Sequence, residues 1–257
     1  MSGLPANGPR LLQITDSHLL ADPAAGHAGV RPEARWRATL EAMRPWAASA
    51  AALLHSGDLV HDGSAAAYQR VHAGLAGLGL PGRVIPGNHD DRALLQATFA
   101  SGAVNTARCL QLGEWCVIGL DSLQPGEVAG HLERAELDGL DRALARSASR
   151  YYLIALHHPP FAVATPWLDA IGLDNPGPLL ERVAADRRIR AIVCGHVHMA
   201  HDGRLEGCRT LTTPATAAQF LAGAEGFAID TGPPAFRWLD LRADGGIDTG
   251  VVRLAMD

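Results

Sequence analysis

Lysine is absent from the 257 residues of this chain, so all 22 basic side chains are arginine. This absence excludes Schiff-base catalysis, a lysine general base and the P-loop lysine that contacts nucleotide phosphates. The 27 acidic residues exceed the basic ones by five, which leaves no basic excess for binding a nucleic-acid backbone. Duplex DNA or RNA is therefore not an expected partner.

Cysteine and long apolar runs are also scarce. The four cysteines form no Cys-x-x-Cys pair, and Cys116 and Cys194, which lie in strand-like runs, are typical of small buried apolar residues. No apolar run approaches the roughly 18 residues that a membrane helix needs, and the N-terminal MSGLPANGPR contains no apolar leader. We therefore expect no membrane partner and a reducing cytoplasm as the location.

Apolar runs typical of strands alternate with alanine-rich segments typical of helices. The strand-like runs span residues 10–15, 52–56, 83–85, 115–120, 151–156 and 190–194. The helix-compatible segments span 34–50, 64–78, 92–99, 133–147 and 177–186. This alternation predicts an α/β fold in one domain over residues 1–257. From about residue 208 the pattern changes to β-hairpins, which we expect to complete a sheet and which could overhang the site.

Side chains that bind metals gather directly after five of the strand-like runs. The clusters are Asp16-Ser17-His18, Gly57-Asp58, Gly87-Asn88-His89-Asp90, His157-His158 and Gly195-His196-Val197-His198. Residues i and i+2 of an extended segment point the same way, so Asp-x-His and His-x-His each direct two ligands into one cavity. One such pair is more often incidental, but the ordered set predicts a site. Carboxylate, imidazole and amide ligands suit Mn, Fe or Zn.

The series D-x-H, GD, GNHD, H and GHVH resembles the motifs of the calcineurin-like metallophosphoesterases over residues 11–198. This resemblance implies a four-layer α/β/β/α sandwich of two mixed sheets that holds two divalent metal ions. It implies that one ion binds Asp16, His18, Asp58 and His198, and that the other binds Asp58, Asn88, His157 and His196. The later segments TPATAAQF and FAIDTGPPAFRWLDL are similar to the class III cyclic-nucleotide phosphodiesterase branch.

Two metal ions about 3.5–4 Å apart activate a bound water, so that hydroxide attacks the phosphorus of a diester in line. We expect His89 to contact the phosphate or to protonate the leaving oxygen, with Asn88 and Asp58 as further catalytic residues. Asp90 has two interpretations, orientation of His89 or a ligand histidine, or capping of the next helix. His158 likewise either touches the substrate or caps a turn.

The resemblance favours a small phosphodiester as substrate, namely 3′,5′-cyclic AMP, which would be hydrolysed to 5′-AMP. A glycerophosphodiester or a cyclic sugar phosphate is the alternative, because the metal ligands do not contact the alcohol part. A non-catalytic scaffold is a third hypothesis, which the complete ligand set disfavours. The resemblance also suggests a homodimer.

Few aromatic residues are available to hold a nucleotide base. Phe161, Trp167 and Phe220 are candidates, although such residues more often pack in a loop or the core than hold a base. His201 could lie near the mouth of the site. Segment 159–178 is either a lid or an ordinary irregular connection beside the site. The remaining histidines are interpreted as surface or core residues: His27, His55, His61, His72 and His131.

Overall fold

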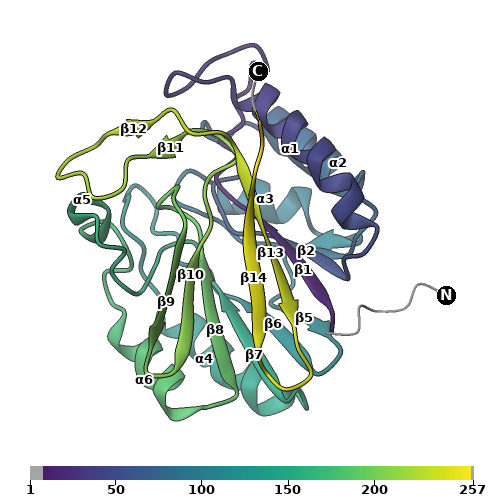
Figure 1. Ribbon diagram of the computed structural model, residues 1–257, viewed down its shortest axis with the longest axis vertical. Coiled ribbons are helices and arrows are strands. Elements are labelled where there is room, and N and C mark those ends of the chain that lie inside the picture. Colours follow the sequence, from purple (N-terminus) through teal and green to yellow (C-terminus); the bar gives the residue numbers. More distant parts are fainter. Residues whose placement is uncertain (1–7, 256–257) are drawn as a thin grey trace.

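The computed structural model describes residues 8–255 and places most strands in two six-stranded sheets (Figure 1). The order of the first sheet is β14 (Ile247–Arg253), β13 (Ala235–Leu241), β1 (Arg10–Ile14), β2 (Ala52–His55), β3 (Gly82–Val84) and β4 (Val104–Asn105). The strands from β1 to β4 are parallel, whereas β13 pairs antiparallel with both β1 and β14. The C-terminal hairpin thus completes the sheet that contains the first strand, as predicted. This pairing supports a single domain, which stays a prediction.

The second sheet is also mixed. Its order is β5 (Cys109–Leu112), β6 (Trp115–Gly119), β7 (Tyr151–Ala155), β8 (Ile189–Cys194), β10 (Cys208–Thr212) and β9 (His201–Leu205). The central strands β6, β7, β8 and β10 run parallel, and the edge strands β5 and β9 run antiparallel to their neighbours. A separate ribbon of β11 (Gln219–Phe220) and β12 (Ile229–Asp230) lies at the upper left of Figure 1.

Helices cover the outer face of each sheet. They are α1 (Pro32–Ala47), α2 (Ala65–Ala76), α3 (Arg92–Thr98), α4 (Arg134–Arg146) and α6 (Gly177–Ala185), whereas α5 (Pro166–Asp169) lies apart from them. Trp36 of α1 and Tyr68 of α2 share an apolar core with Leu12 of the first sheet. Leu140 of α4 shares another core with Ile154 of the second sheet. The short α5 lies in the loop that follows β7.

A third apolar core lies between the two sheets. Leu11 on β1 belongs to it, whereas the next residue, Leu12, belongs to the core under the helices. This alternation follows from the two-residue period of a strand. Because both faces of the central strands are covered, their sequences are continuous apolar runs. The predicted four-layer α/β/β/α sandwich is confirmed.

All predicted strands and helices are present within a few residues of their predicted bounds. The strands that the sequence did not predict include β9, whose sequence HDGRL contains Asp and Gly, which are rare in strands. Pairing with β10 makes this segment a strand despite its composition. No helix within residues 8–255 is long and apolar enough to cross a membrane.

Glycines allow the loops after the strands of both sheets to meet at one edge. A Cβ on Gly195, after β8, would fall 2.1 Å from Oγ1 of Thr15, after β1. A Cβ on Gly57, after β2, would fall 2.3 Å from Nδ1 of His157, after β7. These two positions therefore require glycine for close approach. The close approach brings the polar clusters of separate strands together.

We expect Leu153→Ala to lower the free energy of unfolding by about 2–5 kcal/mol, because it leaves a cavity between the sheets. Leu221→Ala is the control, since Leu221 is 48% exposed and its loss should change stability by less than about 0.5 kcal/mol. Urea unfolding followed by circular dichroism measures both values. Equal destabilisation by the two substitutions would contradict a tightly packed core between the sheets.

Candidate metal centre

The turns after the strands hold several predicted ligands in a left-handed backbone conformation. The φ angles are 54° for Asp16, 46° for His18, 53° for Asp58, 68° for His196 and 46° for His198. Residues other than glycine rarely adopt such angles, and the strain persists only where the surrounding structure compensates for it. Such strain clusters at functional sites, so the backbone itself marks these five residues as candidates.

Asp16, His18 and His198 form one cluster of buried ligand atoms. Oδ1 of Asp16 lies 3.1 Å from Nε2 of His198, and Nε2 of His18 lies 3.2 Å from the same His198 nitrogen. Nε2 of His18 is also 3.6 Å from Oδ2 of Asp58. The three residues are close enough to bind one metal ion together.

Asp58 and His157 form a second cluster that shares Asp16 with the first. Nε2 of His157 lies 3.4 Å from Oδ2 of Asp58 and 3.9 Å from Oδ1 of Asp16. The His157 ring is also near that of His196, with 5.2 Å between centroids. Nδ1 of His196 lies 3.1 Å from Oδ1 of Asn88. All seven residues predicted as metal ligands therefore converge on one place.

Backbone carbonyl groups orient three of the histidines. Nδ1 of His157 donates to the carbonyl of Ser56 at 2.8 Å, and Nδ1 of His198 donates to that of Ala218 at 2.7 Å. Nε2 of His196 donates to the carbonyl of Ile171 at 2.9 Å. A carbonyl only accepts hydrogen bonds, so in each ring the other nitrogen faces the cluster. This arrangement is typical of metal-binding histidines.

The chemistry of the cluster fits divalent metal ions. Asp16 and Asp58 are buried, and no arginine among residues 8–255 forms an ion pair with either of them. Nε2 of His157 is buried without a hydrogen-bond partner in that range. Burial opposes ionisation of Asp16, but His198 and His157 outweigh it and lower the pKa of Asp16 to about 2. The two buried carboxylates thus lack a permanent cation, which bound metal ions would supply.

Burial and neighbouring charges also shift the pKa values of two imidazoles. Burial, together with His157, lowers the pKa of His196 to about 3. Burial opposes protonation of His157 as well, but Asp58 and Asp16 raise its pKa to about 9. His196 is therefore already neutral, as a ligand must be, whereas His157 would release a proton when a metal ion binds.

His89 lies at the edge of the cluster, beside Asn88. Its backbone N–H donates to Oδ1 of Asp58 at 2.9 Å, and its Nδ1 lies 3.3 Å from the carbonyl oxygen of His61. The ring stacks on His61 and lines a cavity. His89 is thus held next to the predicted ligands by two separate contacts.

Asp90 anchors two loops through their backbones. Its carboxylate accepts hydrogen bonds from the N–H groups of Leu59 and Gly87 and from the hydroxyl of Tyr68. It therefore fixes the loops that carry Asp58 and Asn88. The alternative that Asp90 caps the next helix is wrong, because Asp91 is the N-cap of α3. Its hydrogen bonds also give no support to the idea that it orients a histidine.

His158 lies beside two predicted ligands, with its ring centroid 4.8 Å from that of His157 and 4.6 Å from that of His196. Its Nδ1 is 2.8 Å from the hydroxyl oxygen of Ser122, and Gly130 packs directly against its ring. Its Nε2 is buried without a hydrogen-bond partner among the described residues. His158 does not line the cavity, so a direct substrate contact gains no support.

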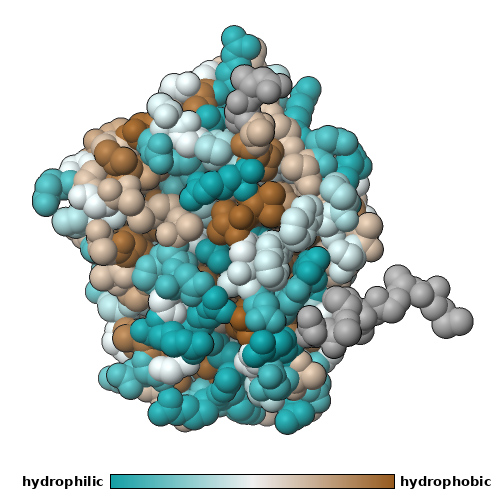
Figure 2. All heavy atoms as spheres, viewed as in Figure 1, coloured by the Kyte–Doolittle hydropathy of each residue, from teal (hydrophilic) through white to brown (hydrophobic). Residues whose placement is uncertain are grey.

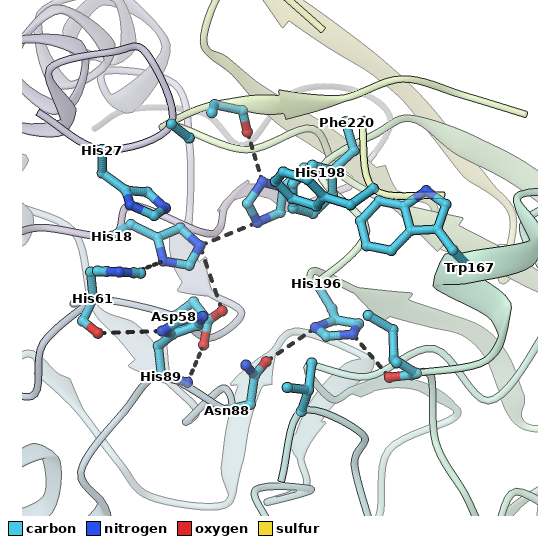
Figure 3. A pocket seen from close by; sticks show the side chains of 15 residues that line it. His18, His27, Asp58, His61, Asn88, His89, Trp167, His196, His198 and Phe220 are labelled. Carbon is cyan, nitrogen blue, oxygen red and sulfur yellow. Dashed lines mark hydrogen bonds and ion pairs between the residues drawn. The ribbon is translucent and has the colours of Figure 1, made fainter. Parts of the chain in front are cut away.

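The cluster opens into a cavity of about 260 Å³ (Figure 3). Asp58, Asn88 and the histidine rings lie around one part of the cavity, and Phe220 and Trp167 lie beyond His198 and His196. Of the residues considered for a nucleotide base, Trp167 and Phe220 line the cavity, and Phe161 does not. Phe161 stacks on His201 instead, so neither of these two residues reaches the cavity.

His27 and His61 also line the cavity, which corrects their interpretation as ordinary surface or core residues. Their rings are 3.8 Å apart, and Nδ1 of His61 lies 3.4 Å from Nδ1 of His18. His61 follows the GD motif by three residues, which was an available signal. His27 lies in a loop whose sequence gives no such signal.

Comparison with known proteins provides independent information. The family model for calcineurin-like phosphoesterases matches residues 9–200. The 3′,5′-cyclic adenosine monophosphate phosphodiesterase CpdA of Escherichia coli K12 is 37% identical over 247 residues, which are 96% of this chain and 90% of that protein. The enzyme of the same name from Pseudomonas aeruginosa is 34% identical over 95% of this chain and 89% of its own.

Solved structures share the fold. A dimetal phosphatase from Danio rerio has a TM-score of 0.68 and covers 97% of this chain and 100% of its own, at 13% sequence identity. At this low identity the similarity concerns the fold alone.

We expect Mn²⁺ to raise the melting temperature of metal-free protein, because it would bind the folded cluster and relieve its buried negative charge. At about 100 times the dissociation constant the stabilisation is about 2.7 kcal/mol, which corresponds to a rise of roughly 5–10 °C. Differential scanning calorimetry after EDTA treatment measures the shift. Asp58→Asn should lose most of it, and an equal shift in this variant would contradict the predicted ligands.

We expect His61→Ala to weaken Mn²⁺ binding about 10- to 100-fold. Nδ1 of His61 can accept the proton on Nδ1 of His18, and this contact directs Nε2 of His18 to the cluster. Titration calorimetry measures the affinity. His61→Gln retains a hydrogen-bond acceptor and should restore part of the Mn²⁺ affinity. His72→Ala, on α2 outside the cavity, is the matched control. Unchanged affinity in His61→Ala would rule out this orienting role.

Proposed function

The chain belongs to the calcineurin-like phosphoesterase family and is a metal-dependent phosphodiesterase, and we propose that its substrate is 3′,5′-cyclic AMP, hydrolysed to 5′-AMP. The observation that carries this proposal is the cavity in which the carboxylate of Asp58 and several imidazoles meet an aromatic surface. Relatives named for this reaction match nearly the whole chain and support the choice of substrate.

The proposed site holds two divalent ions. Asp16, His18 and His198 would bind the first, and Asn88, His157 and His196 the second. Asp58 would bridge the two, since its Oδ2 lies 3.6 Å from Nε2 of His18 and 3.4 Å from Nε2 of His157. Mn, Fe and Zn all match these ligands.

Bound divalent ions would supply Lewis-acid activation of the attacking water and of the phosphoryl oxygens. Asn88 and Asp58 would orient the site, because Asn88 contacts His196 and Asp58 accepts the backbone N–H of His89. The reaction adds one water across the bond between phosphorus and the 3′ oxygen. The 3′ oxygen leaves with a proton, and the product is a monoester.

His89 is the proposed donor to the leaving oxygen or to the phosphate. Its position supports this role, since it lines the cavity next to Asn88 and Asp58. Its Nδ1 lies 3.3 Å from the carbonyl oxygen of His61, which only accepts. Nε2 is then the nitrogen that faces the substrate, and it can donate a proton only while the ring carries a proton on both nitrogens.

Another small diester remains the alternative substrate, because the polar part of the cavity would recognise the phosphoryl group alone. A glycerophosphodiester or cyclic sugar phosphate would leave the aromatic part of the cavity without a role. A non-catalytic scaffold is disfavoured by the family relationship and by the presence of every proposed ligand. The homodimer stays a prediction.

We expect the Mn²⁺-loaded protein to hydrolyse 3′,5′-cyclic AMP with a kcat/KM at least tenfold above that for glycerophosphocholine, 2′,3′-cyclic AMP or an aryl diester. Asn88→Ala should lower kcat/KM at least 100-fold, since it removes a proposed ligand. Asn105→Ala, at the distant edge strand β4, is the matched control. Turnover of the aryl diester alone would overturn the substrate assignment and leave the phosphodiesterase activity standing.

A further inference from the structure

Two large apolar side chains that line the cavity, Val128 and Phe227, are exposed, whereas the exposed Leu221 lies outside it. Among residues 8–255, the exposed large hydrophobic residues are Val128 at 52%, Leu221 at 48% and Phe227 at 69%. Val128 and Phe227 line the cavity, and Leu221 follows Phe220 directly in the chain. Figure 2 shows hydrophobic atoms gathered at the upper left, over the region of β11, β12 and α5. Exposed apolar surface beside a cavity is typical of a binding site.

Three aromatic rings from two distant segments form a continuous wall, which we call the aromatic wall: Trp167, Phe220 and Phe227. Their centroids are 5.0 Å apart for Trp167 and Phe220, 5.5 Å for Trp167 and Phe227, and 5.6 Å for Phe220 and Phe227. All three pairs meet edge to face, at 71°, 72° and 68°. Edge-to-face packing is a favourable arrangement of aromatic rings. Phe227, which is 69% exposed, is the ring most available to a ligand.

The aromatic wall begins immediately beside the proposed metal ligands. The ring of Phe220 lies parallel to that of His198, with 4.1 Å between centroids and 5° between planes. One ring, that of His198, therefore lies between the wall and Asp16. A substrate whose phosphoryl group lies at the cluster could place a substituent, one sugar away, against the wall.

We propose that the aromatic wall binds the base of a cyclic nucleotide by stacking, and that Phe227 is its main determinant of specificity. This inference rests on the proposed function and deepens it. No wall residue carries a charged group or an amide. Its single polar group is the indole N–H of Trp167, which is buried without a hydrogen-bond partner among the described residues. The wall therefore recognises a planar ring rather than the hydrogen-bonding edge of a particular base.

Stacking on aromatic side chains depends little on base identity, because each base has a π face. Cyclic AMP and cyclic GMP should therefore differ by less than about tenfold in KM. A larger ring offers more area for stacking, so a pyrimidine cyclic nucleotide should bind more weakly than either purine. The methyl ribofuranoside 3′,5′-cyclic phosphate, which lacks the base, should bind most weakly of all.

The test compares cyclic AMP with this base-free analogue in the Mn²⁺-loaded enzyme. Phe227→Ala should reduce the preference for cyclic AMP, measured as the ratio of the two kcat/KM values, by about 5- to 100-fold. The loss should appear in KM rather than kcat, since the base is remote from the bond that breaks. Phe227→Tyr should retain the preference. Leu221→Ala is the matched control, because it removes an exposed apolar side chain of the same region outside the cavity.

The outcomes separate the inference from the proposed function. A preserved preference in Phe227→Ala, with wild-type turnover of cyclic AMP, overturns the base site and leaves the proposed function intact. Equal loss in Leu221→Ala also overturns it, because the effect would then come from the segment rather than from the wall. Absence of turnover of any cyclic nucleotide by the wild type, with activity on an aryl diester, overturns the proposed function and this inference together.

Discussion

The burial of Asp16 and Asp58 without an arginine partner is the constraint on which the site depends. Burying a carboxylate is unfavourable unless opposite charge or hydrogen bonds compensate for it. Here imidazoles provide the nearest partial compensation, and His157 is the one whose pKa rises in response. The proposed metal ions would supply the positive charge that the two buried carboxylates need.

The two sheets bring short loops together at one edge, and these loops carry the buried carboxylates and the imidazoles around them. Backbone hydrogen bonds from Asp16 to Gly57 and from His18 to Asp58 continue the pairing of β1 and β2 beyond the strands. Asp90 then joins the loop after Asp58 to the loop before Asn88 through backbone N–H groups. Strained backbone angles are compensated by these contacts. These hydrogen bonds hold the predicted ligands in place through the backbone of the loops that carry them, and such support favours precise coordination.

The cavity combines two surfaces of different chemistry. Its polar part would recognise a phosphoryl group, which many diesters share. Its aromatic part comes from α5 and from the segment around β11 and β12, outside the strands that carry the proposed ligands. Catalytic ligands and the surface that would select the substrate thus come from separate segments. Such separation lets the selecting surface vary without disturbing the cluster.

The sequence by itself determined the layers of the fold and the identity of the seven proposed ligands. Apolar runs and short motifs such as Asp16-x-His18 are local features, and the order of the motifs along the chain is specific. The tertiary structure decided what depends on distant contacts. It brought His61 to His18, assigned the cap of α3 to Asp91 instead of Asp90, and placed Phe227 rather than Phe161 at the cavity. These outcomes depend on which loops lie together in the folded chain, and of them only the place of His61, three residues after the GD motif, had a local signal.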